Sequence, residues 1–237
     1  MKVTTIVSSS WGRRISRAET QDACRCTPDP SPLKAAQDGD IRLTMRIFVA
    51  LDIDQTIRQR IERFLEGVRE FAPDARWVRP ESLHVTLQFV GEKPPQTVEQ
   101  VKSSLAKIQG AAMELAFRGY GFFPAPKSAR VFWVGIEAGP ELSSLAAEID
   151  EALLAMHIPK EEHAFSPHLT LARGGKSGAP RQASDRTGVK FDRLREKLNA
   201  LPQPEFGTMT AREFFLYESK LSGGGAQYTK LERFPLR

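Results

Sequence analysis

The chain carries one short pattern twice, as His84-Val85-Thr86-Leu87-Gln88-Phe89 and as His168-Leu169-Thr170-Leu171-Ala172-Arg173. On a β-strand, residues i and i+2 share a face, so each histidine lies beside the threonine that follows it. Val85, Leu169 and Phe89 then belong to the opposite face, which we expect to lie in the core. A strand with polar side chains on one face and apolar ones on the other is typical of a sheet beside a cleft.

Paired imidazoles and hydroxyls suit a reaction at phosphorus. The ordinary pKa of histidine, about 6.5, lets one imidazole be neutral while another is charged near neutral pH. Two facing imidazoles can therefore act as general base and general acid in one displacement. The threonine hydroxyls can donate hydrogen bonds to phosphoryl oxygens. Because an imidazolium supplies positive charge, we expect neither a metal nor another cofactor.

Composition excludes several classes of protein. With 237 residues, 41% of them hydrophobic and 27% charged, the chain is neither collagen-like nor wholly disordered. Its apolar runs, such as residues 47–51, are too short to cross a membrane. Cys24 and Cys26 can neither staple a fold nor complete a zinc site, and a reduced, cytoplasmic setting is expected. The net charge of +5 fits an anionic partner without requiring one.

Strands and helices are expected to alternate from Met45 onward. Apolar periodicity predicts helices near 54–70, 95–109, 141–156 and 191–201, and strands near 45–52, 77–90, 113–123, 131–136, 167–173, 212–218 and 228–234. A loop rich in Gly, Ser and Arg is expected over 174–188. Residues 1–44 lack such periodicity, so we expect a disordered tail or a true start at Met45. Residues 45–237 then form one domain of two similar halves.

Several separate segments, in the same order, resemble the two-histidine phosphoesterases, specifically the RNA 2′,3′-cyclic phosphodiesterases also named 2′-5′ RNA ligases. The segments are residues 46–51, 77–91, 121–124, 130–135, 165–173 and 216–221, with Tyr228. The resemblance runs from Met45 to the C-terminus. It implies an α+β, bilobal fold in which two antiparallel sheets face a central cleft and the helices lie outside.

The resemblance also implies metal-independent hydrolysis of an RNA 2′,3′-cyclic phosphate end to a 2′-phosphate. His84 would be the proton donor and His168 the proton acceptor. Thr86, Thr170 and Arg173 would bind the phosphate. Reverse 2′-5′ ligation would be minor in water. The implied partner is an RNA with a cyclic phosphate end, tRNA fragments included, and the protein would be a monomer.

Other interpretations stay open at this point. Strict strand alternation would turn Arg173 away from the histidines, although a strand end can twist. Phe48, Trp77 and Arg130 are candidates for RNA contact, against core packing for the aromatics and plain surface charge for the arginine. The alternative functions are a phosphodiesterase acting on a small cyclic nucleotide, such as ADP-ribose 1″,2″-cyclic phosphate, and a non-catalytic RNA-end binding module. Intact copies of both motifs favour an enzyme, and the lack of a third ligand near either motif disfavours a zinc hydrolase.

Overall fold

The computed structural model describes residues 44–160, 164–174, 191–222 and 225–237. These residues belong to one compact unit, Ile41–Arg237. The expected tail and nearly all of the expected loop over 174–188 lie outside the described residues. The division of the chain at residue 45 therefore stays a prediction.

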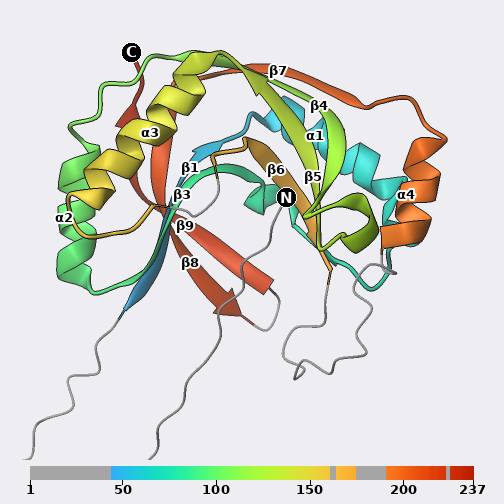
Figure 1. Cartoon of the computed structure of the whole chain (residues 1–237), viewed down its shortest axis with the longest axis horizontal. Coiled ribbons are helices and arrows are strands. Elements are labelled where there is room, and N and C mark those ends of the chain that lie inside the picture. Colours follow the sequence, from blue (N-terminus) through green and yellow to red (C-terminus); the bar gives the residue numbers. More distant parts are fainter. Residues whose placement is uncertain (1–43, 161–163, 175–190, 223–224) are drawn as a thin grey trace, which may run out of the picture. The chain divides into compact units, whose positions relative to one another are not determined.

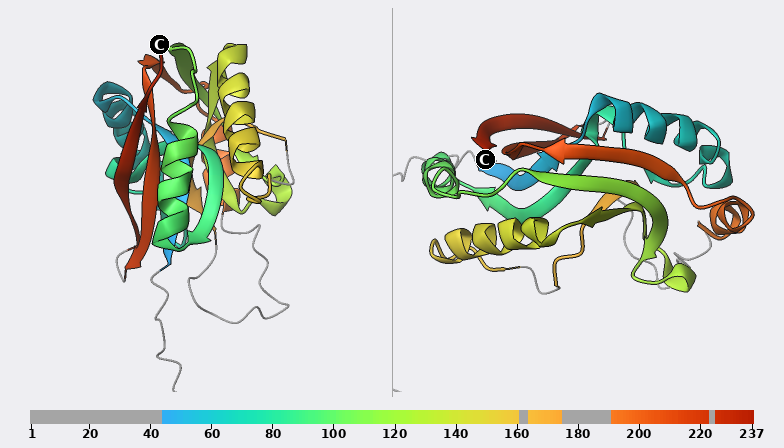
Figure 2. Two further views of the ribbon diagram at one scale, coloured as in Figure 1. Left: turned by 90° about the vertical axis from the view of Figure 1, so that its left-hand side faces the viewer. Right: turned by 90° about the horizontal axis from the view of Figure 1, so that it is seen from above.

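The described strands form a single antiparallel sheet, which is strongly curled (Figures 1 and 2). The strands are β1 (Met45–Asp52), β2 (Arg76–Trp77), β3 (His84–Lys93), β4 (Met113–Phe123), β5 (Val131–Ala138), β6 (His168–Arg173), β7 (Glu205–Ala211), β8 (Glu213–Ser222) and β9 (Gly225–Pro235). Their order across the sheet is β7-β4-β5-β6-β3-β1-β8-β9, and β2 pairs with β6.

Two similar halves meet in the middle of this sheet. One half is built on β1, α1 and β3, the other on β5, α3 and β6, and a strand pair flanks each of them. The halves join where Val85 of β3 pairs with Leu169 of β6. The expected two-lobed α+β architecture is confirmed, and this pairing makes the two sheets continuous at the point where the two His-x-Thr segments lie.

The α-helices in the described part of the chain lie at the periphery of the strands (Figures 1 and 2). They are α1 (Gln55–Glu66), α2 (Pro95–Leu105), α3 (Pro140–Leu154) and α4 (Asp192–Asn199). Helix α1 shows why they form, because Ile57, Ile61 and Leu65 recur at four-residue intervals and are all buried. It ends at Glu66, earlier than the periodicity predicts, and Gly67 caps it. No helix in the described part of the chain is long and apolar enough to cross a membrane.

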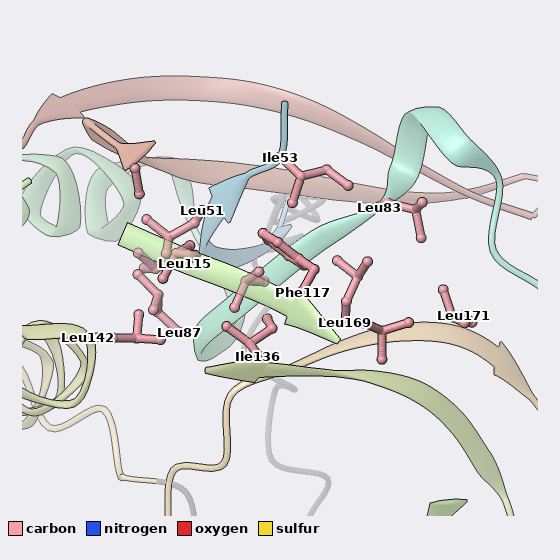
Figure 3. Close-up of a cluster of buried hydrophobic side chains, with 14 of the residues drawn as sticks. Leu51, Ile53, Leu83, Leu87, Leu115, Phe117, Ile136, Leu142, Leu169 and Leu171 are labelled. Atoms are coloured by element: carbon pink, nitrogen blue, oxygen red, sulfur yellow. The ribbon is translucent and has the colours of Figure 1, made fainter. Parts of the chain in front are cut away.

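The main core lies on one face of the curled sheet and draws on both halves. Figure 3 shows Leu51, Leu87, Phe117, Ile136 and Leu169, which come from five different strands, in one cluster. All of them are less than a tenth exposed. Burial of this apolar surface holds the two motif strands side by side.

Strand β7 is absent from the elements predicted by the sequence. Its buried residues Phe206 and Met209 are three apart, which breaks the alternation that marks a strand. The cause is an irregularity where β7 pairs with β4, at which Phe206 has no partner of its own. Gly207 accommodates it with a φ of 105°, a conformation that favours glycine.

Candidate active site

The two His-x-Thr segments bring four polar side chains together at the centre of the sheet. Val85 and Leu169 pair across the antiparallel strands β3 and β6, and both are fully buried. The neighbouring positions therefore face the other way, with the histidine of each strand opposite the threonine of the other. We call this surface, which bears His84, Thr86, His168 and Thr170, the histidine face. On it the histidines occupy one diagonal and the threonines the other.

Both imidazoles are held in the same way. Nδ1 of His84 lies 2.7 Å from the carbonyl oxygen of Ser82, and Nδ1 of His168 lies 2.8 Å from that of Ser166. A carbonyl only accepts hydrogen bonds, so Nδ1 donates and the neutral ring presents the lone pair of Nε2. The sequence analysis missed these orienting residues, although Ser-x-His-x-Thr-Leu occurs in both motifs.

Burial lowers the pKa of both histidines. For His84 the pKa falls from 6.5 to about 4, mainly because burial penalises the charged ring. The Arg173 cation lowers the pKa further, whereas the hydrogen bond to the Ser82 carbonyl and the charge of Asp52 raise it. For His168 burial is again the largest cause, and Arg173 lowers the pKa further. Both rings are therefore neutral near pH 7 in the free protein, and a bound phosphate anion favours uptake of a proton.

Aromatic rings pack around His84 and cause much of this burial. The ring of Phe48 lies 4.8 Å from the imidazole, and that of Tyr228 lies 5.0 Å away, edge-on. Phe48 also stacks on Tyr217 at 5.2 Å. The Phe48 side chain is 3% exposed, so its faces are already covered by protein and it supports His84 rather than offering a surface to a base.

A second aromatic group flanks His168. Phe123 meets the imidazole edge-on at 5.0 Å, and Trp133 lies 6.3 Å away. The indole of Trp133 lies flat against Gly121, where an added Cβ would come within 2.1 Å of the ring. Glycine is therefore required beneath this indole. The buried indole N–H of Trp133 has no hydrogen-bond partner within the described residues.

An irregularity in β6 decides which of its residues reach the histidine face. On the neighbouring strand β5, Trp133 pairs with Thr170 and Phe132 pairs with Ala172. Leu171 is therefore an extra residue, a β-bulge, and Leu171 and Ala172 are both buried. Beyond Leu171, the alternation of side chains between the two faces of the strand is shifted by one residue.

The bulge places Arg173 on the histidine face. Arg173 pairs with Val131 and is exposed, three residues from Thr170 instead of the two or four that strict alternation would require. Strict alternation, which would turn it away from the histidines, therefore does not hold at this end of β6. Its charge lowers the pKa of His84 and His168, which agrees with its place on this face. Its role on a phosphate stays a prediction.

Strand β3 carries the same irregularity at the same point of its motif. On β1, Ala50 pairs with Thr86 and Val49 pairs with Gln88, so Leu87 is the extra residue. Leu87 and Gln88 are both buried. The expectation that Phe89 faces the core is wrong for this reason, because the shift moves it to the histidine face.

A carboxylate stands beside His84. Asp52, the last residue of β1, pairs with His84 across the strands. Its Oδ1 accepts a hydrogen bond from Arg58 at 2.8 Å, and its Oδ2 accepts one from Lys230 at 2.5 Å. Arg58 also donates to the carbonyl of Pro80. The sequence analysis did not identify this group, because its members are far apart in the chain.

The other two candidates for RNA contact, Trp77 and Arg130, differ in where the structure places them. Trp77 packs edge-on against Phe132, and its indole N–H donates to the carbonyl of Ala72 at 3.1 Å. It therefore belongs to the core. Arg130 is exposed beside the end of β6, where its carbonyl accepts a hydrogen bond from Gly174 at 2.7 Å. Contact between Arg130 and RNA stays a prediction.

The side of His84 opens onto a hollow. It is lined by polar and aromatic residues, among them Asp52, Arg58, Tyr217, Tyr228 and Lys230. Another hollow, between α2 and β9, contains neither motif. Within the part of the chain that the structure describes, no three His, Cys, Asp or Glu side chains are grouped as metal ligands would be.

Comparison with known proteins agrees with this duplicated arrangement. A family model described as LigT-like phosphoesterase matches the chain twice, over residues 51–133 and 134–228. Each match contains one His-x-Thr segment. The boundary between the two matches lies between the motifs but does not follow the halves of the sheet, because β4 falls in the first match and β8 in the second.

Similar proteins cover most of the chain. Two curated RNA 2′,3′-cyclic phosphodiesterases are 31% identical over 198 residues (Methanothermobacter thermautotrophicus; 82% of this chain, 100% of the relative) and 30% identical over 190 residues (Archaeoglobus fulgidus; 80% and 99%). Among solved structures, TT0787 of Thermus thermophilus has a TM-score of 0.63 at 30% identity, and Escherichia coli LigT complexed with 3′-AMP has 0.65 at 25%. Each covers 81% of this chain, which covers 98% of theirs. The chain belongs to the LigT-like family of two-histidine phosphoesterases.

Proposed function

We propose that this protein hydrolyses RNA 2′,3′-cyclic phosphate ends to 2′-phosphate ends. The observation that carries the proposal is the histidine face, where two imidazoles with Nδ1 bound to carbonyls leave two Nε2 atoms for one substrate. Relatives with that activity in their names match the chain over nearly their whole length.

The reaction is an in-line displacement at phosphorus. A water oxygen forms the new bond to phosphorus while the bond from phosphorus to the 3′ oxygen breaks. His168 accepts the proton that the water loses, and His84 donates a proton to the departing 3′ oxygen, which leaves as a hydroxyl. Thr86 and Thr170 donate hydrogen bonds to the non-bridging oxygens, and Arg173 balances their charge. The imidazolium and this guanidinium supply the positive charge, so the proposed step uses no metal.

One charge, that of Asp52, distinguishes the two histidines, whereas the Arg173 cation acts against the protonated form of both. Asp52 lies beside His84 and favours its protonated form, as a donor requires. The described charge that acts on His168 is the Arg173 cation, which favours the neutral form that an acceptor requires. Because burial holds the pKa of free His84 at about 4, His84 takes up its proton together with the anionic substrate.

The remaining parts of the proposal concern the setting. The substrate is an RNA end, tRNA fragments included, and the reverse 2′-5′ ligation is minor because water is in large excess. One chain supplies both motifs, so the protein acts as a monomer. Residues 45–237 form the enzyme domain, and the compartment is the cytoplasm.

The experiment is to incubate the purified protein, in EDTA, with a short RNA that ends in a 2′,3′-cyclic phosphate. The product end is then identified with a phosphatase specific for 3′-phosphates and by chromatography against 2′- and 3′-phosphate standards, because the two ends have the same mass. A 2′-phosphate supports the proposal. A 3′-phosphate would show that the other oxygen leaves, and a reaction restored only by added metal would contradict the metal-independent step. The absence of product would leave RNA-end binding or a small cyclic nucleotide as the function.

A further inference from the structure

We propose that Arg58 of α1 is a positioning residue that fixes His84 for proton donation. The inference rests on the proposed function and deepens it, because it names what holds the proton donor in place. Arg58 acts on His84 indirectly, through the carboxylate of Asp52 and through the turn that precedes the histidine.

The guanidinium of Arg58 makes three hydrogen bonds to two separate segments, the end of β1 and the turn before His84. Nη2 donates to Oδ1 of Asp52 at 2.8 Å and to the carbonyl of Ile53 at 3.3 Å, and Nη1 donates to the carbonyl of Pro80. The side chain is 12% exposed, so solvent screens these contacts little. Because a guanidinium is planar and its donors form a rigid fork, it holds both segments in one arrangement.

Pro80 connects Arg58 to the orientation of the His84 ring. It opens the short 3₁₀ helix η2 (Pro80–Ser82), and the carbonyl of Ser82 accepts the hydrogen bond from Nδ1 of His84 at 2.7 Å. The carbonyl of Pro80 also accepts a hydrogen bond from the backbone N–H of Leu83 at 3.2 Å, so Arg58 binds an atom that helps to close this turn. A displaced turn would move the Ser82 carbonyl away from Nδ1 and so change the direction in which Nε2 points.

Asp52 connects Arg58 to the charge of His84. Asp52 pairs with His84 across the strands, and its charge raises the pKa of that histidine. Lys230 also binds Asp52, but the lysine side chain is 44% exposed. Arg58 is therefore the more buried of the two cations, and without it the position of the carboxylate would depend on a solvated partner.

The half that contains His168 has other residues at the two corresponding positions. Gly135 pairs with His168 and so occupies the position of Asp52. Ser143, the fourth residue of α3, occupies the position that Arg58 has in α1. The carboxylate and the guanidinium thus serve one histidine only, as expected where one ring must donate a proton and the other must accept one.

The first test compares the tautomers of the two histidines by NMR, with His168 as the internal reference. In long-range proton–nitrogen spectra at a pH where both rings are neutral, the wild-type protein should carry its proton on Nδ1 of each ring. His84→Asn and His168→Asn assign the two signals. Arg58→Gln should release the His84 ring into a mixture of the two tautomers, whereas His168 should keep its proton on Nδ1.

The second test is steady-state kinetics with a dinucleotide that ends in a 2′,3′-cyclic phosphate. We expect Arg58→Gln to lower kcat by roughly 10- to 100-fold with little change in KM, as for a small displacement of a catalytic group. Arg58→Lys should recover part of the loss, because an ammonium keeps the charge without the fork that serves both Asp52 and Pro80. It also carries both tests, with smaller changes of the same kind, should Arg58→Gln not fold.

Arg60→Gln is the matched control, because Arg60 lies on the same helix and donates to the carbonyl of Phe206 at 3.0 Å, on β7. It should match the wild type in both tests. An unchanged His84 tautomer, an unchanged kcat or equal changes at both histidines would overturn the inference, and so would a loss confined to KM, which would make Arg58 a substrate contact. Wild-type protein that does not hydrolyse the dinucleotide would contradict the proposed function itself. The tautomer comparison needs no turnover and would still decide the role of Arg58, which separates the two failures.

Discussion

Replacing Arg173 with glutamine should change both substrate binding and the pH dependence of the reaction. The β6 bulge puts this guanidinium on the histidine face, where it lowers the pKa of both histidines. The charge that we propose to attract the phosphate therefore also disfavours the protonated imidazole that the proposed reaction needs. Removing it should weaken binding and ease protonation at once.

The size of the binding effect follows from the exposure of Arg173. A hydrogen bond to a charged group contributes about 1.5–3 kcal/mol, and an exposed side chain belongs at the low end because solvent screens it. We therefore expect kcat/KM to fall by roughly 10-fold at acidic pH. Arg173→Lys should recover part of the loss, since it restores the charge but not the bidentate geometry.

The pH effect has a definite sign. The proposed mechanism requires one charged and one neutral imidazole in the free protein, and both pKa values lie below 6.5. Wild-type kcat/KM should therefore decline as pH rises above the higher of the two values. Without the Arg173 cation both pKa values rise, so the decline should begin at higher pH. The disadvantage of Arg173→Gln should accordingly shrink between pH 5 and pH 8.

The assay is kcat/KM against pH for the cyclic dinucleotide, with ionic strength held constant. Arg118→Gln serves as control, because Arg118 is a half-exposed arginine paired with Glu137 away from both motifs. An Arg173→Gln profile that matches the wild type in height and position would refute the reasoning. It would mean that the side chain does not act on the histidine face.

Three further predictions concern the same surface and its support. Thr86→Val and Thr170→Val should each lower kcat by roughly 10- to 100-fold without changing the fold, because each removes one preorganised hydrogen-bond donor. Steady-state kinetics would measure the loss, and an unchanged kcat would count against the phosphate contact. Asp52→Asn should lower the pKa of His84 and move the acidic side of the kcat/KM profile to lower pH; a shift to higher pH would contradict the role of this carboxylate. Leu169→Ala should destabilise the fold by about 2–5 kcal/mol in urea unfolding, because Leu169 is fully buried where the halves meet; a loss below about 1 kcal/mol would mean that the junction is not a core position.

The positions of the described helices and of most strands could be predicted because they depend on local periodicity, whereas β7, whose alternation is broken, was missed. Segments 84–86 and 168–170 alternate strictly, so the faces of their histidines and threonines follow from the sequence alone. The bulges at Leu87 and Leu171 could not be predicted, since each depends on pairing with another strand. This is why Phe89 was assigned to the wrong face and why Arg173 stayed ambiguous.

Residues around the histidines escaped prediction for a related reason. Asp52, Arg58 and Lys230 come from three elements, and only the folded sheet brings them beside His84. The carbonyls of Ser82 and Ser166 orient the rings through backbone atoms, which no choice of side chain reveals. Burial of Phe48 likewise depends on Tyr217, more than 160 residues away in the chain.

The central claim is that His84 and His168 act as one acid–base pair, and a double-mutant cycle tests it most directly. The measurement is kcat for RNA 2′,3′-cyclic phosphate in EDTA with His84→Asn, His168→Asn and the double variant, each checked for folding by circular dichroism. The account predicts that each single variant loses about 10²- to 10⁴-fold and that the double variant is little worse than either. Near-normal turnover by one single variant, or losses that multiply in the double variant, would contradict the paired mechanism.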